Sequence, residues 1–476
     1  MKIMKSKQAK KVINYILIII TIIITMISIY NIKKMNILPT KYFIPIILLE
    51  IILNILIIFL LKSKKNICLI LAIIILLIAN TGNIIVNNYT VKTNKFIEKT
   101  FKEYLTISTD YVLITSNENS VNTKDELPKK QNIYYFKYSR NIELAKKKLG
   151  SYNYISTDSI SHVLSDINNN KVVYLLISKA DIDYLIESSI EYKREDYKII
   201  ESFKVDFKQK INNEVKDNYT IYLNGTDFSG VMRDINLIVT INTKTKKILI
   251  TSVLRGYYID VPAYNMKDTL MCLGAYDSNV SKEAIEKLFD IKIDYIVNVN
   301  TNSLVDIVDT LGGVEFCSDY SFTTTHVLTD NTYNDKTGKK LNVIKGCKEY
   351  NGVEILTIAR ERLNLKNNER GRIENCEKIL ISIAKKTASQ NTLLNFDEVL
   401  NSYSKLYTTD MNKNVITNLL KTLIDNYGEY EISVQNPDGT DGKAIGHLGT
   451  QEVGVTFPNN EQVKAASIKI KETLGE

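Results

Sequence analysis

The sequence has 476 residues, of which 45% are hydrophobic, so it is long enough for two or three domains. It contains 61 basic and 53 acidic residues, but eleven of the lysines and a single acid lie within residues 1–65, and the other 50 basic and 52 acidic residues nearly cancel. Because the positive charge is confined to one end, the composition argues against nucleic acid as a partner.

Three stretches near the N-terminus each approach the roughly 20 apolar residues that cross a bilayer. They are residues 12–30, 43–61 and 67–86, and three spans so close together exclude a simple cleaved signal peptide. Lysines are dense before the first stretch and between the second and third, which the positive-inside rule places in the cytoplasm. We therefore expect a multi-pass plasma-membrane protein with a cytoplasmic N-terminus, whose chain beyond about residue 90 is extracellular.

One acid, Glu50, lies within the second apolar stretch. A carboxylate that faces lipid is energetically costly, so we expect Glu50 to face another helix. A part in proton relay is the alternative for a carboxylate at this depth.

Residues 91–105 have the charged helical pattern of a stalk, after which short β-rich runs alternate with helical ones. Strands are expected at 111–115, 172–177 and 198–205, and helices at 141–149, from 157 or 159 to 167, and at 181–188. This alternation predicts a small α/β accessory domain with parallel strand pairing. Nothing in this part resembles a catalytic motif.

A polar stretch, residues 208–218, separates this part from a second α/β pattern. Strands are expected at 220–223, 235–241, 248–253, 293–300 and 313–317, and helices at 281–289, 301–311, 351–359, 372–387 and 415–427. The pattern predicts a three-layer α/β/α fold with a mixed sheet. A Gly-rich, irregular tail at 430–455 is expected to precede a last helix at 460–474.

These patterns divide the chain into three parts. We predict three transmembrane helices in residues 1–90, a stalk and accessory domain in residues 91–210, and a catalytic domain with a C-terminal extension in residues 211–476.

Four arginines stand close together at Arg360, Arg362, Arg370 and Arg372. An apolar helical run, residues 353–359, delivers the first pair, and the second pair opens the next helix. Arginine is a planar fork of donors that stays charged near neutral pH, which suits it to grip phosphate. The cluster indicates a polyanion site, and solvated surface charge is the alternative.

Two carboxylates and an arginine lie at the ends of predicted strands, where α/β proteins place their active-site groups. Asp227 and Asp234 would suit Mg²⁺, which takes one or two carboxylates and fills its shell with water and phosphate oxygens. Their alternative role is that of turn formers beside glycines. Arg255 ends the third strand, so acid and arginine would together suit metal and phosphate.

The order and spacing of the motifs resemble the LytR-CpsA-Psr family between residues 219 and 387 and, more weakly, to the C-terminus. The motifs are Gly-x-Asp at 225–227, Arg-Asp at 233–234, Ser-Val-Leu-Arg at 252–255, Asp-Thr-Leu-Met-Cys-Leu-Gly-Ala-Tyr at 268–276, Ile-Asp-Tyr-Ile-Val-Asn-Val-Asn at 293–300, Val-Asp-Thr-Leu-Gly-Gly-Val-Glu at 308–315, Arg-Glu-Arg at 360–362 and Arg-Gly-Arg-Ile-Glu-Asn at 370–375. The spans and accessory domain ahead of them resemble the family's longer members.

The resemblance implies a phosphotransferase that moves a glycopolymer, such as teichoic acid or capsule, from undecaprenyl pyrophosphate to peptidoglycan outside the membrane. The lipid would lie in an apolar tunnel between sheet and helices. By the family's pattern, Mg²⁺ or Mn²⁺ is bound by Asp227 and Asp234, and the pyrophosphate by Arg255, Arg360, Arg362 and Arg372. The implied catalytic residues are Asp227, Asp234 and Arg255.

The chain departs from the family's pattern at three positions, with Gly256 for an acid, Thr269 for a lysine and Cys376 for a glutamine. Lys267 is a candidate to replace the missing lysine. The departures leave two other functions open. One is a non-catalytic receptor that binds polyprenyl pyrophosphate and regulates envelope synthesis, and the other is a hydrolase that transfers the same phosphodiester to water.

Cys317 and Cys347 flank an excursion, residues 318–346, that the family places near the site. Outside the membrane a disulfide between them is permitted. Cys272 and Cys376 lie in motif segments and are expected to be reduced.

Overall fold

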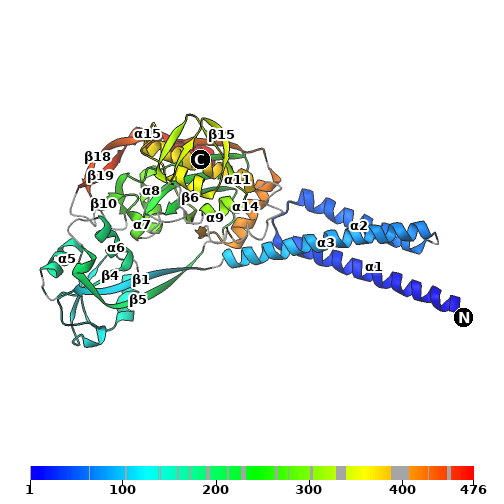
Figure 1. Ribbon diagram of the computed structural model, residues 1–476, viewed down its shortest axis with the longest axis horizontal. Coiled ribbons are helices and arrows are strands. Elements are labelled where there is room, and N and C mark those ends of the chain that lie inside the picture. Colours follow the sequence, from blue (N-terminus) through cyan, green and yellow to red (C-terminus); the bar gives the residue numbers. More distant parts are fainter. Residues whose placement is uncertain are drawn as a thin grey trace.

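The computed structural model describes residues 2–476 except 64, 102–103, 138, 140, 158–159, 170, 172, 189–192, 212–213, 227–231, 263–265, 277, 301–303, 328–338, 388–401, 403–406, 427 and 447–451. Figure 1 shows three parts: a bundle of long helices that extends away from the rest, a small α/β domain built on β1 and β5, and a larger α/β domain.

The helical bundle consists of α1 (Lys2–Met35), α2 (Thr40–Lys62) and α3 (Asn66–Thr100). Each helix contains a segment long and apolar enough to cross a membrane. Large apolar side chains point outward, and Phe59 is 72% exposed, as expected for residues that face lipid. The charged end of α3 continues to Thr100, within the segment for which the sequence predicted a stalk.

Glu50 faces the other two helices, as predicted. Its carboxylate accepts hydrogen bonds from the Asn83 amide at 3.1 Å and from Thr25 Oγ1 at 3.4 Å. Further polar contacts join the helices, among them Asn80 Nδ2 to Thr21 Oγ1 at 3.2 Å. Because backbone and side-chain polar groups must be satisfied inside a bilayer, these contacts specify which helix faces meet.

The accessory domain has one sheet of order β3-β2-β4-β1-β5. Its strands are β1 (Tyr104–Ser116), β2 (Asn132–Phe136), β3 (Asn153–Thr157), β4 (Leu175–Ser178) and β5 (Tyr197–Lys210), and its helices are α4 (Ile142–Leu149), α5 (Ile160–Asn168) and α6 (Lys179–Ser188). The predicted parallel pairing holds for β2 with β3 and β4, but β1 is antiparallel to β4 and β5. β1 begins the domain and β5 ends it. Tyr104 pairs with Lys210, so the chain enters and leaves at the same end of the sheet, and β1 and β5 must run in opposite directions.

The larger domain is built on a six-stranded mixed sheet of order β16-β11-β6-β7-β8-β17. These strands are β6 (Asn218–Thr226), β7 (Arg233–Asn242), β8 (Lys247–Ser252), β11 (Tyr295–Asn300), β16 (Tyr407–Thr409) and β17 (Glu431–Gln435). β6 and β11 are parallel, as are β8 and β17, whereas β7 is antiparallel to both of its neighbours. The predicted mixed sheet is confirmed.

Helices cover both faces of this sheet, which gives the predicted three layers. Alternate residues of a strand point to opposite faces. Tyr222 packs on one face in a core shared with α8 (Ser278–Phe289) and α15 (Asn460–Leu474). Tyr219 and Ile221 pack on the other face against α14 (Lys413–Asp425).

A second core lies beside the sheet, where α10 and α11 carry the arginine-rich stretch. Its elements are α9 (Leu304–Thr310), β12 (Val314–Ser318), β13 (Phe322–Val327), β14 (Lys340–Val343), β15 (Gly346–Tyr350), α10 (Gly352–Arg360) and α11 (Glu369–Thr387). Asn351 and Glu354 form a capping box that starts α10. Cys317 and Cys347 lie opposite each other on β12 and β15 and form a disulfide, which closes the excursion between them.

The prediction of an irregular tail was wrong. After β17 the chain forms a hairpin of β18 (Gly439–Ile445) and β19 (Glu452–Pro458), and α15 follows. The glycines that suggested irregularity allow close strand contact, since a Cβ atom at Gly439 would lie 2.2 Å from the carbonyl oxygen of Phe457. The hairpin lies beside β9 (Tyr258–Val261), which pairs with β10 (Met266–Thr269) ahead of α7 (Leu273–Tyr276).

Candidate anion-binding site

Three segments bring charged side chains together at the end of the sheet. Arg255 follows β8, Asp234 lies at the start of β7, and Glu369 lies in the first turn of α11. Arg255 joins them, with Nη1 2.5 Å from Asp234 Oδ1 and Nε 2.9 Å from Glu369 Oε1. The strand-end placement that the sequence predicted for Asp234 and Arg255 therefore puts them in contact.

Glu369 is the centre of this cluster. Arg372 donates to both of its carboxylate oxygens, at 2.6 and 3.2 Å, and also to the carbonyl oxygen of Asp234 at 2.7 Å. Burial opposes ionisation of Glu369, but the guanidinium groups of Arg372, Arg255 and Arg362 hold its pKa below the ordinary value. Arg372 is only 6% exposed, and although burial opposes its charge, Glu369 raises its pKa. Both groups are therefore ionised at neutral pH.

The Arg360–Arg362 loop is held by the acid between its arginines. Glu361 is fully buried and accepts the backbone N–H groups of Arg362 at 2.9 Å and Asn364 at 3.0 Å. It also accepts the backbone N–H and the hydroxyl of Thr325, on β13 of the disulfide-closed excursion. Burial opposes its ionisation, yet these hydrogen bonds keep the pKa of Glu361 below the ordinary value. A buried carboxylate thus fixes the loop that presents Arg362.

The two arginines that flank Glu361 differ in exposure. Arg360 is the last residue of α10 and is half-buried. Arg362 is exposed, and its charge lowers the pKa of Glu369, which places it within electrostatic reach of the cluster. The cluster itself consists of Asp234, Arg255, Glu369 and Arg372.

Arg370 points away from this cluster. Its Nε lies 2.5 Å from Asp438 Oδ1, its Nη1 3.5 Å from Asp441, and its Nη2 donates to the Gly439 carbonyl oxygen at 3.2 Å. Arg370 thus holds the C-terminal hairpin against α11, a role that local spacing could not reveal.

Two of the family departures have a packing explanation. At Gly256 the hairpin takes the available space: Thr456 donates its N–H to the Gly256 carbonyl oxygen at 2.7 Å, and an added Cβ would lie 3.1 Å from Thr456 Oγ1. Thr269 is fully buried, and its hydroxyl lies 3.0 Å from Cys272 Sγ. The amino group of Lys267, the candidate replacement for the lysine, lies 3.7 Å from the carboxylate of half-buried Asp260.

Cys376 occupies the third departure and is buried between α10 and α11. Its thiol donates to the Ala359 carbonyl oxygen at 3.5 Å, and burial raises its pKa to about 11. Cys272 and Cys376 are free thiols, as expected.

The donor set fits a hard divalent cation as far as the structure describes it. Asp227 lies outside the described residues. Asp234 is partly exposed and uses one carboxylate oxygen for Arg255. Mg²⁺ needs only one or two protein carboxylates, with water and phosphate oxygens in its other positions. The second oxygen of Asp234 is chemically suited to such an ion.

The sequence analysis gave no role to three acids on the arginine-bearing segments, namely Glu361, Glu369 and Glu377. Glu377, on α11, is buried and hydrogen-bonds with Ser252 at the end of β8. Burial raises its pKa to about 7 despite this bond. The acid three residues before Arg372 was a usable signal, because side chains at i and i+3 of a helix are neighbours.

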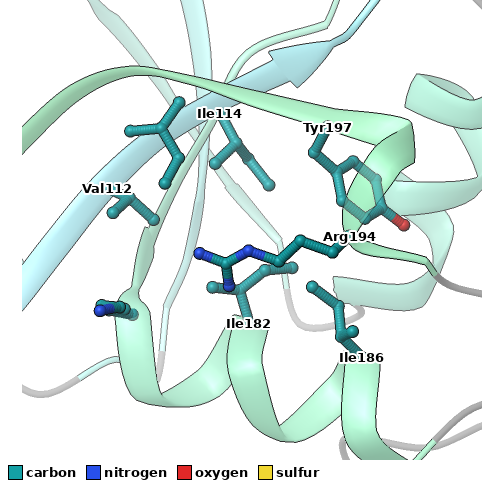
Figure 2. Close-up of a pocket in the computed structure, with 8 residues that line it drawn as sticks. Val112, Ile114, Ile182, Ile186, Arg194 and Tyr197 are labelled. Atoms are coloured by element: carbon teal, nitrogen blue, oxygen red, sulfur yellow. The ribbon is translucent and has the colours of Figure 1, made fainter.

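A separate cavity lies in the accessory domain. It has a volume of about 180 Å³ and lies between α6 and the strands β1 and β5. Figure 2 shows Arg194 extending over its apolar wall, which includes Ile182 and Val112. Arg194 forms an ion pair with Asp183, and the cavity contains none of the predicted site residues.

Comparison with known proteins identifies the family of this chain. The model of the LytR_cpsA_psr family matches residues 184–466, more than half of the chain. A polyisoprenyl-teichoic acid–peptidoglycan teichoic acid transferase TagU from Enterococcus faecalis is 25% identical over 222 residues, which cover 45% of this chain and 68% of that protein. The protein of the same name from Bacillus cereus is 25% identical over 284 residues, 57% of this chain and 85% of its own length.

Solved structures resemble a little over half of the chain. TagT bound to LI-WTA is 20% identical, with a TM-score of 0.43, and covers 55% of this chain and 92% of its own. TagV of B. subtilis is 18% identical, with a TM-score of 0.45, and covers 55% of this chain and 99% of its own.

Proposed function

Because the chain belongs to the LytR_cpsA_psr family, we propose that it transfers a teichoic-acid-like glycopolymer from undecaprenyl pyrophosphate to peptidoglycan. The observation that carries the proposal is the cluster of Arg255, Arg372, Asp234 and Glu369 at the strand ends, with Arg362 close by. The acceptor and polymer class come from the names of the curated relatives. The membrane carrier comes from the resemblance and the apolar helices.

The arginines have different proposed roles, which follow from their charge balance and burial. Within the cluster two arginines face two carboxylates, so the exposed Arg362, whose charge reaches Glu369, adds positive charge for an incoming pyrophosphate, and Arg360 lies two residues before it. Arg372 donates three N–H groups to protein acceptors and is almost fully buried, so it mainly orients Glu369 and Asp234. Arg255 is more accessible and is the cluster's contact to phosphate.

The transfer step forms a bond between an acceptor sugar hydroxyl and the phosphorus that carries the polymer, and breaks the bridging P–O bond of the pyrophosphate. The hydroxyl proton passes to a carboxylate, Asp234 or Asp227, and the lipid phosphate leaves. Positioned arginines offset the charge that develops on the leaving phosphate in a partly dry site. Bound Mg²⁺, held by Asp234 and Asp227, would add charge neutralisation there.

The proposed topology places α1, α2 and α3 across the plasma membrane and both α/β domains outside. The lysine distribution and the Cys317–Cys347 disulfide support it, since disulfides persist outside the cytoplasm. A cysteine at Asn117 should react with an impermeant thiol reagent on intact cells, whereas one at Ser6 should not. Labelling of the Ser6→Cys variant alone would show that the orientation is opposite to the proposed one.

The deciding experiment incubates the purified full chain with lipid-pyrophosphate-linked polymer and Mg²⁺, with and without peptidoglycan oligomers. Polymer joined to glycan supports the transferase. Free phosphorylated polymer in both reactions identifies a hydrolase instead. Tight binding without conversion identifies a receptor, the function favoured by Gly256 and Thr269, which stand where the family's pattern has an acid and a lysine.

A further inference from the structure

The catalytic domain contacts the outer ends of the membrane helices through both ends of one helix. α14 begins at Lys413, whose amino group lies 3.5 Å from Glu98 near the end of α3. It ends at Asp425, whose carboxylate lies 3.1 Å from Lys41 at the start of α2. Glu98 also pairs with Lys34 of α1 at 3.4 Å. Helix α14 therefore lies across the end of the bundle, where Figure 1 shows the bundle meeting the large domain.

Aromatic side chains mark the level of the membrane surface at this contact. Tyr30 near the end of α1 and Tyr42 near the start of α2 are both exposed, and tyrosine is enriched where helices leave the bilayer. Lys41 precedes Tyr42, and its amino group lies 5.2 Å from the centre of the Tyr42 ring. The ion pair between Lys41 and Asp425 thus sits at headgroup depth.

An apolar strip continues from this contact along the edge of the sheet. It consists of Ile424, next to Asp425, and of Ile432 and Val434 on the edge strand β17. These side chains are 38%, 49% and 38% exposed, respectively. Ile432 and Val434 stand beside Ile248 and Ile250 in register, so they point to the sheet face that α14 covers.

Charge links β17 to the anchor as well. Glu429, just before β17, hydrogen-bonds with Lys246, and the cations of Lys246 and, to a smaller extent, Lys41 hold the pKa of Glu429 below the ordinary value. Lys41 therefore lies within electrostatic reach of the segment that leads into the strip. The strip and the anchor contact are therefore linked along the chain, through Asp425 and Glu429, and by charge.

We propose that this surface rests on the outer leaflet of the bilayer, with Ile424, Ile432 and Val434 in contact with lipid. The inference depends on the membrane insertion proposed above, and not on the transfer reaction. Exposed ion pairs alone contribute little, because solvent screens them. Removal of apolar side chains from water contributes in proportion to the buried area, and lipid adjacent to Tyr42 is the apolar phase within reach.

Docking of this surface on the bilayer limits the distance between the anion-binding cluster and the membrane. β8 and β17 run parallel, and β8 starts at Lys247, next to the Lys246–Glu429 pair. Arg255 lies eight residues further along the chain, so it is no more than about 28 Å from this edge. A lipid-linked pyrophosphate at the cluster would then keep its phosphates at a fixed, short distance from the membrane.

The chain contains no tryptophan, which makes a single introduced tryptophan an unambiguous reporter. The full chain is reconstituted into nanodiscs of ordinary lipid or of lipid brominated near the headgroup. Ile432→Trp is compared with Ile445→Trp, an equally exposed apolar site on the C-terminal hairpin, and with Phe59→Trp on α2 as a control for insertion. We expect a shift of emission to shorter wavelength and a loss of intensity in brominated lipid for Ile432→Trp but not for Ile445→Trp.

The ion pair between Lys41 and Asp425 provides a second test of the docking. Adding Asp425→Lys to Ile432→Trp should reduce the quenching, and adding Lys41→Asp as well should restore it. The matched control is Asp319→Lys, which reverses an exposed acid paired with Lys378 on α11 and should leave the quenching unchanged.

Quenching of Phe59→Trp together with equal signals from Ile432→Trp and Ile445→Trp overturns the docking while insertion stands. Absence of quenching for Phe59→Trp overturns insertion and the docking with it. A blue shift of Ile432→Trp that grows with protein-to-lipid ratio and occurs without bromine quenching identifies a second copy of the chain as the occupant, and also overturns the proposal. Transfer activity enters none of these outcomes.

Discussion

Glu369 accepts the Nε–H of Arg255 at 2.9 Å, and this contact ties the first turn of α11 to the end of strand β8. The same carboxylate neutralises buried Arg372. The cluster is therefore a structural unit before any ligand binds.

Replacing Glu369 by Gln should lower the free energy of unfolding by about 3 kcal/mol, because it leaves the buried Arg372 cation without its partner. The control is Asp319→Asn, which removes an exposed acid paired with Lys378 on the same helix and should change stability by less than about 1 kcal/mol. Urea unfolding of both variants measures the difference. Equal effects would show that Glu369 is not the centre of the cluster.

The lowered pKa of Glu369 gives this stabilisation a pH dependence. An acid whose pKa is lower in the folded protein stabilises it fully above the unfolded pKa, near 4.3, and progressively less as the pH falls through the folded value. The difference between parent and Glu369→Gln should therefore narrow as the pH falls below about 4. Persistence of the full difference at pH 2 would contradict the assignment.

Glu377 should behave in the opposite way, since burial raises its pKa to about 7. Below the unfolded pKa both states are protonated, and as the pH rises toward 7 only the unfolded state ionises, so stability falls. At pH 8 the penalty is about 3 kcal/mol. Glu377→Gln should remove it, so the variant is more stable than the parent at pH 8 and similar to it at pH 4. A variant less stable at both pH values would refute this.

Gly256 and Thr456 should be energetically coupled. A Cβ atom at residue 256 would press on Thr456 Oγ1, which is itself held by a hydrogen bond to Asp441 at 2.9 Å. Gly256→Ala should therefore cost about 1 kcal/mol, and much less in a Thr456→Ala background, where the hydroxyl is gone. A double-mutant cycle in thermal unfolding measures the coupling. Strictly additive effects would mean that the hairpin does not occupy the space of the family's acid.

Replacing Arg360 or Arg362 by lysine tests the proposed grip on pyrophosphate. Lysine keeps the charge but loses the two-pronged donor geometry, so affinity for a lipid-linked pyrophosphate should fall by about tenfold at unchanged net charge. Direct binding by the full chain in nanodiscs is the measurement. Arg194→Lys, in the accessory domain, is the matched control and should bind like the parent. Unchanged affinity in all three variants would favour solvated surface charge instead.

Asp234→Asn tests the metal assignment. A neutral amide is a poor ligand for a hard cation, so the variant should lose the Mg²⁺ dependence of transfer. It also weakens the contact to Arg255, and a thermal melt without Mg²⁺ measures that structural effect separately. Full metal-dependent transfer by a stably folded variant would exclude Asp234 as a ligand.

The sequence by itself determined the features that depend on neighbours along the chain. Apolar length marked the three long helices, strand alternation marked the mixed sheet, and α15 begins and ends at the predicted residues. The family motifs likewise indicated that Asp234, Arg255 and Arg372 belong together. Such signals survive in sequence because period and length report directly which face of an element is buried.

Only the tertiary structure decided the contacts between distant segments. The antiparallel course of β1 and β5 follows from where the chain enters and leaves the accessory domain. The strands of the tail form because Gly439 allows them to approach, although its composition suggested irregularity. Arg370 and Arg372 stand two residues apart, yet one binds the C-terminal hairpin and the other binds Glu369. Successive residues of a helix point in different directions, so their partners depend on what the fold brings to each side, which local spacing does not contain.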